Sequence, residues 1–294
     1  MADTAKKPDE DELAGSEAPL VEHLIELRKR LIRSIIVILG LLIVCFFFAG
    51  MIFDVLVQPY RDAVAPTPVE LIYTAPQEFF FTQLSLAFFG AVFIGFPYLA
   101  VEVYGFVAPG LYKKERNAFI PYLVATPVFF ALGAAMVYFA VLPLAMRFFH
   151  SMETGEISML VKVSEYLGLA MTLIIAFGIC FQLPVILTLL AQIEIVTSDM
   201  LKKGRRYAIV AILILAAFIT PPDPISQIGL ALPVYLLYEV SIWAVLWIEK
   251  GRARRLAAEA AATVDDDETP PSTEVAVVPP EAATTPATPA LKTE

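Results

Sequence analysis

The chain has 294 residues, of which 58% are hydrophobic and 17% are charged, with a formal net charge of −9. Soluble domains are about half apolar and about a quarter charged, so this composition excludes a soluble protein. Many of the acidic residues lie near the two ends of the chain, so the net charge does not describe a binding face.

Long stretches without charge predict membrane-spanning helices. Between Arg33 and Asp54 lie 20 residues without Asp, Glu, Lys or Arg, and between Arg116 and Arg147 lie 30. A helix needs about 20 apolar residues to cross a bilayer core of ~30 Å. Uncharged windows occur in chain order at roughly 31–53, 79–101, 118–146, 166–193, 206–220 and 226–248. They do not alternate apolar and polar residues as barrel strands do, so we expect an all-α, polytopic membrane protein with six transmembrane helices.

Prolines within or beside these windows predict bent helices. They are Pro97, Pro109, Pro121, Pro127, Pro143, Pro184 and Pro233. Each proline removes a backbone donor and bends its helix, so we expect a kinked, concave bundle. The fifth window is short: Tyr207 to Pro222 gives 16 uncharged residues, or about 24 Å of helix.

Basic residues predict the orientation of the chain. With six spans, both ends of the chain and the loops around 111–117 and 194–206 lie on one side. That side would carry 18 Lys and Arg residues, and the other side three, Arg61, Arg147 and Lys162. Because cytoplasmic loops are enriched in basic residues, we expect both termini in the cytoplasm. The first window is too long for a cleaved signal peptide and lacks a small-x-small cleavage site.

These patterns divide the chain into three parts. Residues 1–30 form a cytoplasmic segment with an amphipathic helix, since Leu20, Leu24, Leu27 and Leu31 recur at helical spacing. Residues 31–250 form the transmembrane domain. Residues 251–294 form an acidic, proline-rich cytoplasmic tail that we expect to be disordered, because it has too few large apolar residues to build a core.

Residue types needed for catalysis or metal binding are scarce. Cys45 and Cys180 both lie in apolar runs, which favours buried structural thiols over a disulfide or a zinc site. His23 and His150 are far apart in the sequence, and the chain has neither a P-loop nor a Ser/His/Asp grouping. We therefore expect no enzymatic activity, no cofactor and no metal site.

Polar residues inside membrane helices are costly, so each is a candidate for function. Glu102 lies where the second helix nears the interface, where a carboxylate could simply reach headgroup water. Glu239 lies deeper in the sixth window and is harder to explain in this way. Gln182 could form a contact between helices of this chain or meet a polar residue of a partner helix. One alternative function is a small-solute secondary transporter with Glu102 and Glu239 as intramembrane ligands, although no inverted repeat supports it.

The segment before the first window has two interpretations. Glu22, Glu26 and Arg30 follow one another at i, i+4 spacing along one helix face. They could form the salt-bridged side of an interfacial helix. Alternatively, the segment is a receptor surface in which Glu26 is available to an incoming cation.

Four motifs in order resemble the TatC family, the multispanning receptor subunit of the twin-arginine protein translocase. The run HLIELRKRL (residues 23–31) is similar to the family's N-terminal signature, and FVAPGLYKKER (106–116) to its first cytoplasmic loop. FGICFQLP (177–184) is similar to its fourth helix, and TPPDPISQ (220–227) to its last outer turn. The resemblance covers about 20–250, which is essentially the whole membrane region.

The resemblance implies a function without covalent chemistry. TatC proteins bind signal peptides that carry consecutive arginines. They assemble with the single-span subunits TatA and TatB and move folded proteins across the membrane with the proton-motive force. It also implies an oligomeric complex in the bacterial cytoplasmic (inner) membrane, with no nucleic-acid partner.

The family's signal-binding positions fall on Glu26, Arg28, Phe106 and Glu115. A carboxylate suits this role because the guanidinium of arginine forms bidentate, charge-assisted bonds to it that lysine does not reproduce.

Further positions carry over with different roles. Pro59, Tyr138 and Asp223 lie in family-like contexts on the outer half, where we expect structural or assembly roles. Gln182 departs from relatives that have glutamate at the matching position. A neutral amide does not relay protons, so for Gln182 we expect contact with a partner subunit of the TatA or TatB type.

Overall fold

The structure, a computed structural model, describes residues 9–66, 71–107, 120–153, 160–219 and 224–267. For 9–23, 107, 224–226 and 259–267 it describes the backbone but not the side chains. The chain divides into two units, Met1–Lys250 and Gly251–Glu294, and the helical bundle belongs to the first.

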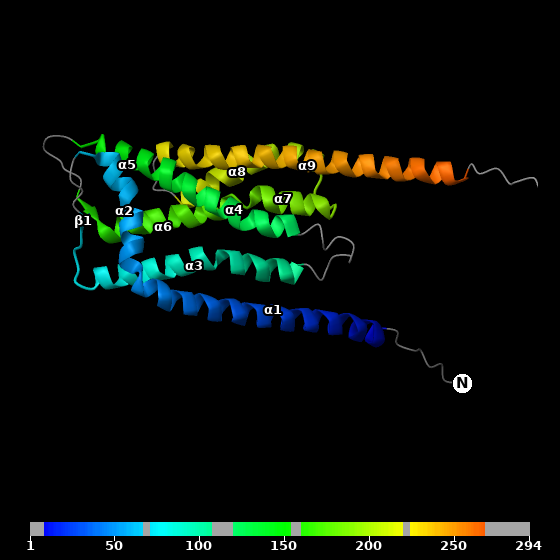
Figure 1. The fold of residues 1–294 in the computed structure, drawn as a ribbon, viewed down its shortest axis with the longest axis horizontal. Helices are drawn as coiled ribbons and strands as arrows, with labels where there is room; N and C mark the ends of the chain where they lie inside the picture. Colours follow the sequence, from blue (N-terminus) through cyan, green and yellow to red (C-terminus); the bar gives the residue numbers. More distant parts are fainter. Residues whose placement is uncertain (1–8, 67–70, 108–119, 154–159, 220–223, 268–294) are drawn as a thin grey trace, which may run out of the picture. The chain divides into compact units, whose positions relative to one another are not determined.

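Helices make up nearly all of the described chain, which confirms the all-α prediction (Figure 1). In order they are α1 (Asp9–Phe47), α2 (Ala49–Val64), α3 (Glu78–Val107), α4 (Ile120–Met136), the π-helix η3 (Val137–Val141), α5 (Leu142–His150), α6 (Val163–Cys180), α7 (Leu183–Gln192), α8 (Ser198–Ile219) and α9 (Pro224–Asp267). The strands β1 (Leu71–Ile72) and β2 (Val161–Lys162) pair in parallel.

Five segments among the described residues are long and apolar enough to cross a membrane, judged by length and composition. They are Leu24–Phe47, Glu78–Phe106, Ile120–His150, Val163–Gln192 and Gln227–Ala258. The fifth window of the sequence forms helix α8, whose first turns carry Lys202, Lys203, Arg205 and Arg206. Because those charges shorten its apolar part, α8 is not among the five, and the count of six spans stays a prediction.

The first uncharged window does not form one helix. α1 ends at Phe47 and α2 begins at Ala49, so the end of the window belongs to a second helix. In Figure 1 α2 runs across the end of the α1–α3 pair instead of continuing α1. It packs chiefly against α3 and α5 and buries Leu56, Val57 and Tyr60 in the main core.

Prolines mark several helix irregularities, as expected from the sequence. Pro143 lies in the first turn of α5, directly after the π-helix η3, and Pro184 lies in the first turn of α7 after a break at 181–182. Pro97, Pro127 and Pro233 instead lie inside α3, α4 and α9. Proline is tolerated in a first turn because the N–H it lacks has no partner within the helix there.

Small residues bring α1 and α3 close together, side by side in Figure 1. A Cβ on Gly95 would collide with Ile38 of α1, and one on Gly90 would collide with Ile52 and crowd Cys45. Ala87 and Ala91 of the same α3 face are fully buried. Small residues at such an interface let two membrane helices approach closely and gain van der Waals contact.

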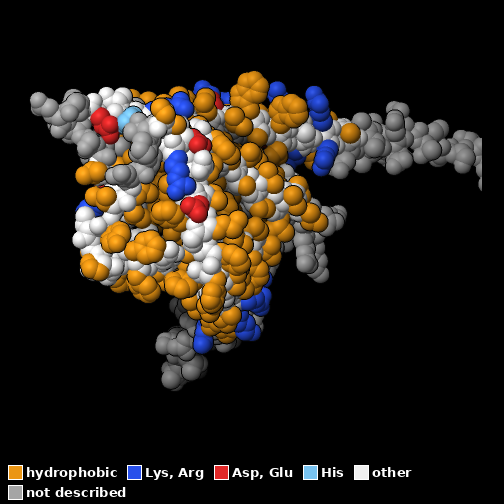
Figure 2. All heavy atoms as spheres, turned by 60° about the vertical axis from the view of Figure 1, so that its left-hand side comes forward, with side chains coloured by type: hydrophobic (Ala, Val, Ile, Leu, Met, Phe, Trp, Pro, Cys, Tyr) orange, Lys and Arg blue, Asp and Glu red, His pale blue; other side chains and the backbone are white. Residues whose placement is uncertain are grey.

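The surface of the bundle is strongly apolar. Large hydrophobic side chains are exposed along α1, α3 and α9, among them Ile36, Ile43, Phe88 and Trp247. Figure 2 shows hydrophobic side chains over most of one face, with charged groups few and scattered. Soluble monomers rarely expose apolar patches of this extent, so this surface is one that lipid covers.

α9 corrects one expectation from the sequence. It continues to Asp267, so residues 251–267 are helical, whereas we expected disorder from 251 onward. The alanine-rich run at 257–262 explains the difference, because alanine is the best helix former. The remainder of the expected tail, 268–294, lies outside the described residues.

Candidate functional site

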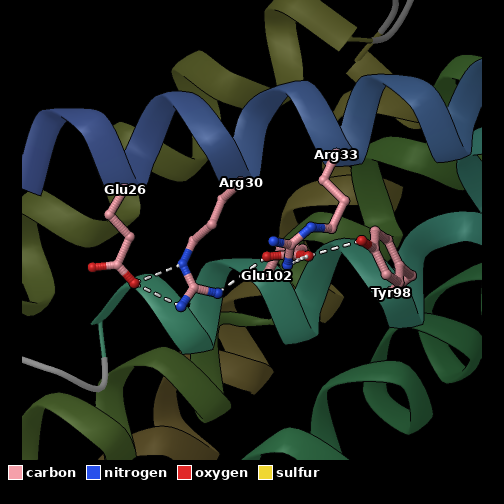
Figure 3. A network of polar contacts seen from close by, with 5 residues as sticks. All are labelled: Glu26, Arg30, Arg33, Tyr98 and Glu102. Carbon is pink, nitrogen blue, oxygen red and sulfur yellow. Dashed lines mark hydrogen bonds and ion pairs between the residues drawn. The ribbon is translucent and has the colours of Figure 1, made fainter.

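Two of the sequence-predicted residues meet at one end of the α1–α3 pair. Glu26 of α1 and Glu102 of α3 are both bonded to the guanidinium of Arg30 (Figure 3). Nε and one terminal nitrogen of Arg30 donate to Oε1 of Glu26 at 3.0 and 2.7 Å. Its other terminal nitrogen donates to Oε2 of Glu102 at 3.1 Å. Arg30 therefore bridges the two carboxylates and ties the two helices together.

Glu102 is the most enclosed member of this cluster. Its side chain is 8% exposed, and its carboxylate accepts hydrogen bonds from three residues. Arg33 donates to Oε1 at 3.0 Å, and the hydroxyl of Tyr98 donates to the same oxygen at 2.8 Å, in addition to the bond from Arg30. Glu102 therefore does more than reach headgroup water, because its charge is balanced by two arginines of this chain.

Glu26 is the more accessible carboxylate, with 35% of its side chain exposed. Both of its bonds to Arg30 end on Oε1, and in Figure 3 the other oxygen points away from Arg30. Within the described residues, no hydrogen bond reaches Oε2 of Glu26. This oxygen can accept further hydrogen bonds, which is what a carboxylate needs to receive a cation.

The other predicted signal-binding residues lie nearby or outside the described chain. Arg28 lies on the exposed side of α1. Phe106 lies in the last turn of α3, directly after Gly105, which contacts the Arg30 guanidinium. Glu115 falls in 108–119, outside the described residues.

Glu239 is paired in a way that closely parallels Glu102. Arg205 of α8 donates to its Oε2 at 2.7 Å, and the hydroxyl of Tyr235, one turn earlier in α9, donates to its Oε1 at 2.9 Å. Both candidate intramembrane carboxylates thus neutralise arginines of this chain. The secondary-transporter alternative used both carboxylates as solute ligands, and in the structure each carboxylate binds an arginine and a tyrosine of this chain.

Gln182 lies between helices and not on an open surface. It is 7% exposed, and its amide nitrogen donates to the backbone oxygens of Thr126 at 3.0 Å and Gly178 at 3.3 Å. Its amide oxygen is buried and, among the described residues, has no hydrogen-bond partner. The amide nitrogen of Gln182 therefore bonds α4 to the break between α6 and α7, while its amide oxygen accepts no hydrogen bond from the described residues.

The residues expected to have structural roles are only partly described. Pro59 is buried inside α2, and Tyr138 of η3 donates its hydroxyl to the backbone oxygen of Val55 at 2.9 Å, which ties η3 to α2. Asp223 falls in 220–223, outside the described residues.

Sequence reasoning missed two members of the cluster, Arg33 and Tyr98. It placed Arg30 beside Glu26 but did not connect Arg30 with Glu102. The Tyr98–Glu102 and Tyr235–Glu239 pairs share the i, i+4 spacing, which puts both side chains on one helix face and could have signalled a hydroxyl–carboxylate contact. The pairing of α1 with α3 has no such local signal. In the part of the chain that the structure describes, no cluster of His, Cys, Asp or Glu could hold a metal ion.

Long apolar helices and a surface of the kind that lipid covers define a multi-pass membrane protein. Arginine–glutamate pairs join α1 to α3 and α8 to α9. The family described as "Sec-independent protein translocase protein (TatC)" matches residues 22–233. The chain belongs to this family. It is therefore a subunit of the twin-arginine protein translocase, a component of a multi-subunit transport complex and not an enzyme.

Individual TatC proteins match this chain over most of their own length. The TatC protein of Magnetococcus marinus is 44% identical over 243 residues, or 83% of this chain and 89% of its own. That of Escherichia coli K12 is 35% identical over 237 residues, or 80% of this chain and 92% of its own. A crystal structure titled as the twin arginine translocase receptor TatC superimposes with a TM-score of 0.70 at 34% identity, covering 77% of this chain and 99% of that one.

Proposed function

We propose that this protein is the receptor of its translocase and binds the twin-arginine signal peptides of folded proteins. The observation that carries the proposal is the Glu26 carboxylate, which Arg30 holds through one oxygen while the other oxygen points away from Arg30 (Figure 3), in a side chain that is 35% exposed. A guanidinium from a signal peptide can donate to that second oxygen without displacing Arg30. Arginine suits such a site better than lysine because its donors are fixed in a planar fork.

The remaining predicted positions complete this receptor surface. Arg28 lies near the middle of α1, between Glu26 and Arg30 in the sequence, and Phe106 lies in the last turn of α3. Glu115 supplies a second carboxylate on a loop that is otherwise basic, between Lys114 and Arg116. Two carboxylates suit two consecutive arginines, one for each guanidinium.

The proposal extends to assembly and energy supply. The receptor recruits TatA- and TatB-type single-span subunits, and transport is driven by the proton-motive force. It lies in the bacterial inner membrane with six spans and both termini in the cytoplasm, as the distribution of 18 against three basic residues suggests. Gln182, buried where α4 meets the break between α6 and α7, supports the docking of a partner helix from within the bundle, and Pro59, Tyr138 and Asp223 support assembly on the outer side.

Photo-crosslinking tests the receptor assignment. A probe beside the twin arginines of a signal peptide should label the wild-type protein in membranes. Glu26→Ala and Glu115→Ala should each reduce labelling, since each removes one or two charge-assisted hydrogen bonds of about 1.5–3 kcal/mol. Undiminished labelling in both variants would contradict the assignment. Solute uptake by the reconstituted protein without TatA or TatB would instead favour a transporter.

A further inference from the structure

We propose that Glu102 is a positioning residue for signal-peptide binding. Acting through Arg30, it holds the Glu26 carboxylate so that Oε2 stays turned toward the incoming arginine. Glu102 itself does not touch the peptide. This inference rests on the proposed receptor function, and the experiments below separate the failure of one from the failure of the other.

The first step is the division of donors on Arg30. An arginine that served only Glu26 could rotate about its long side chain and move the carboxylate with it. Here Nε and one terminal nitrogen bind Glu26, while the second terminal nitrogen binds Glu102 on another helix. The guanidinium is therefore fixed from both sides, and Glu26 is fixed relative to α3 as well as to its own helix (Figure 3).

The second step is the space that Gly105 leaves for the Arg30 guanidinium. A Cβ on Gly105 would collide with the Arg30 guanidinium, so only glycine leaves the guanidinium where it is. Gly105 and Glu102 are three residues apart in α3 and share a helix face. One face of α3 therefore supplies both the space for Arg30 and the carboxylate that holds it.

The third step is charge. Glu26, Arg30, Arg33 and Glu102 carry two negative and two positive charges, which sum to zero. Loss of the Glu102 charge would leave one positive charge in excess beside Glu26. An excess positive charge repels the arginines of a signal peptide, so Glu102 supports binding by both position and charge.

The main experiment measures binding of a fluorescent twin-arginine peptide to the purified full-length protein in detergent. Glu102→Gln should weaken binding by about tenfold, since a tenfold change in affinity corresponds to the loss of about one charge-assisted hydrogen bond. Glu239→Gln is the matched control, because Glu239 likewise accepts from an arginine and a tyrosine, Arg205 and Tyr235, but lies on α9. It should bind the peptide as the wild type does.

A double variant tells positioning from general damage to the fold. If Glu102 positions Glu26, then Glu102→Gln should cause a clearly smaller loss in a Glu26→Gln background than in the wild type, because only the effect of its charge remains there. Additive losses would overturn the proposal, and so would wild-type affinity in Glu102→Gln alone. Normal binding by Glu26→Gln would instead contradict the receptor assignment itself.

Gly105→Ala tests the same idea without changing any charge, and it serves if Glu102→Gln does not fold. The added methyl should displace Arg30 and weaken peptide binding several-fold. Gly40→Ala on α1 is its control, because a Cβ there meets no atom within 4 Å. Equal affinities for Gly105→Ala and Gly40→Ala would overturn the proposal.

Discussion

The close contact between α4 and α6 makes a strong prediction about a single methyl group. A Cβ on Gly133 of α4 would lie 2.7 Å from the backbone oxygen of Phe177 in α6 and 2.9 Å from its carbonyl carbon. Neither atom can turn away as a side chain could, and Phe177 is fully buried. Gly133→Ala must therefore push the two helices apart. Overpacking of this kind costs about 1–3 kcal/mol.

A thiol-reactive dye provides the assay. Cys45 and Cys180 are free and buried, so the dye reports unfolding when heating exposes them. At about 2–4 °C per kcal/mol, Gly133→Ala should lower Tm by roughly 2–12 °C. Gly168→Ala in α6 is the control, since a Cβ there meets nothing within 4 Å. The packing argument fails if the two variants melt at the same temperature.

Three further predictions concern polar contacts. Tyr166→Phe should destabilise the protein more than Tyr138→Phe in the same melting assay. The Tyr166 hydroxyl donates to the backbone oxygen of Leu56 in the buried core, whereas the bond from Tyr138 to the backbone oxygen of Val55 is exposed. The expected losses of stability are about 1–1.5 kcal/mol for Tyr166→Phe and about 0.5 kcal/mol for Tyr138→Phe, and equal losses would contradict this ranking. Glu249→Gln should cost about 1 kcal/mol, because the Glu249 carboxylate accepts from the backbone N–H and the hydroxyl of Ser198 at the start of α8; a Tm equal to that of the wild type would count against this cap. Gln182→Leu should cost about 1–2 kcal/mol in the melting assay, because it removes the hydrogen bonds from the Gln182 amide nitrogen to the backbone oxygens of Thr126 and Gly178; lower recovery of a TatB-type subunit on co-purification would support a docking role, and unchanged recovery would oppose it.

Much of the fold could be predicted from local sequence. Uncharged windows located the long helices because helix formation in a membrane depends on length and hydropathy, which are properties of one segment at a time. Pro143 and Pro184 indicated breaks for the same reason. The boundary between α1 and α2 at 47–49 was not predicted, because no proline or charge lies within that stretch of the window.

The site was only half predictable. Glu26 was selected from a motif and from its i, i+4 spacing to Arg30, which is local information. The partners of Glu102 depend on how α1 packs against α3, and Arg30 lies 72 positions from Glu102 along the chain. A single sequence does not show which residues far apart along the chain lie close together in space. Glu102 and Glu239 therefore looked like unpaired charges, whereas the structure places an arginine beside each.

The short pairing of β1 with β2 also sets an order of events. Leu71 lies opposite Val161, and Ile72 lies opposite Lys162. The chain between them runs out along α3 and returns along α4, η3 and α5, as Figure 1 shows. The two strands therefore meet only after that whole excursion has been synthesised and folded back on itself. The two short strands thus close a stretch of chain that contains α3, α4, η3 and α5.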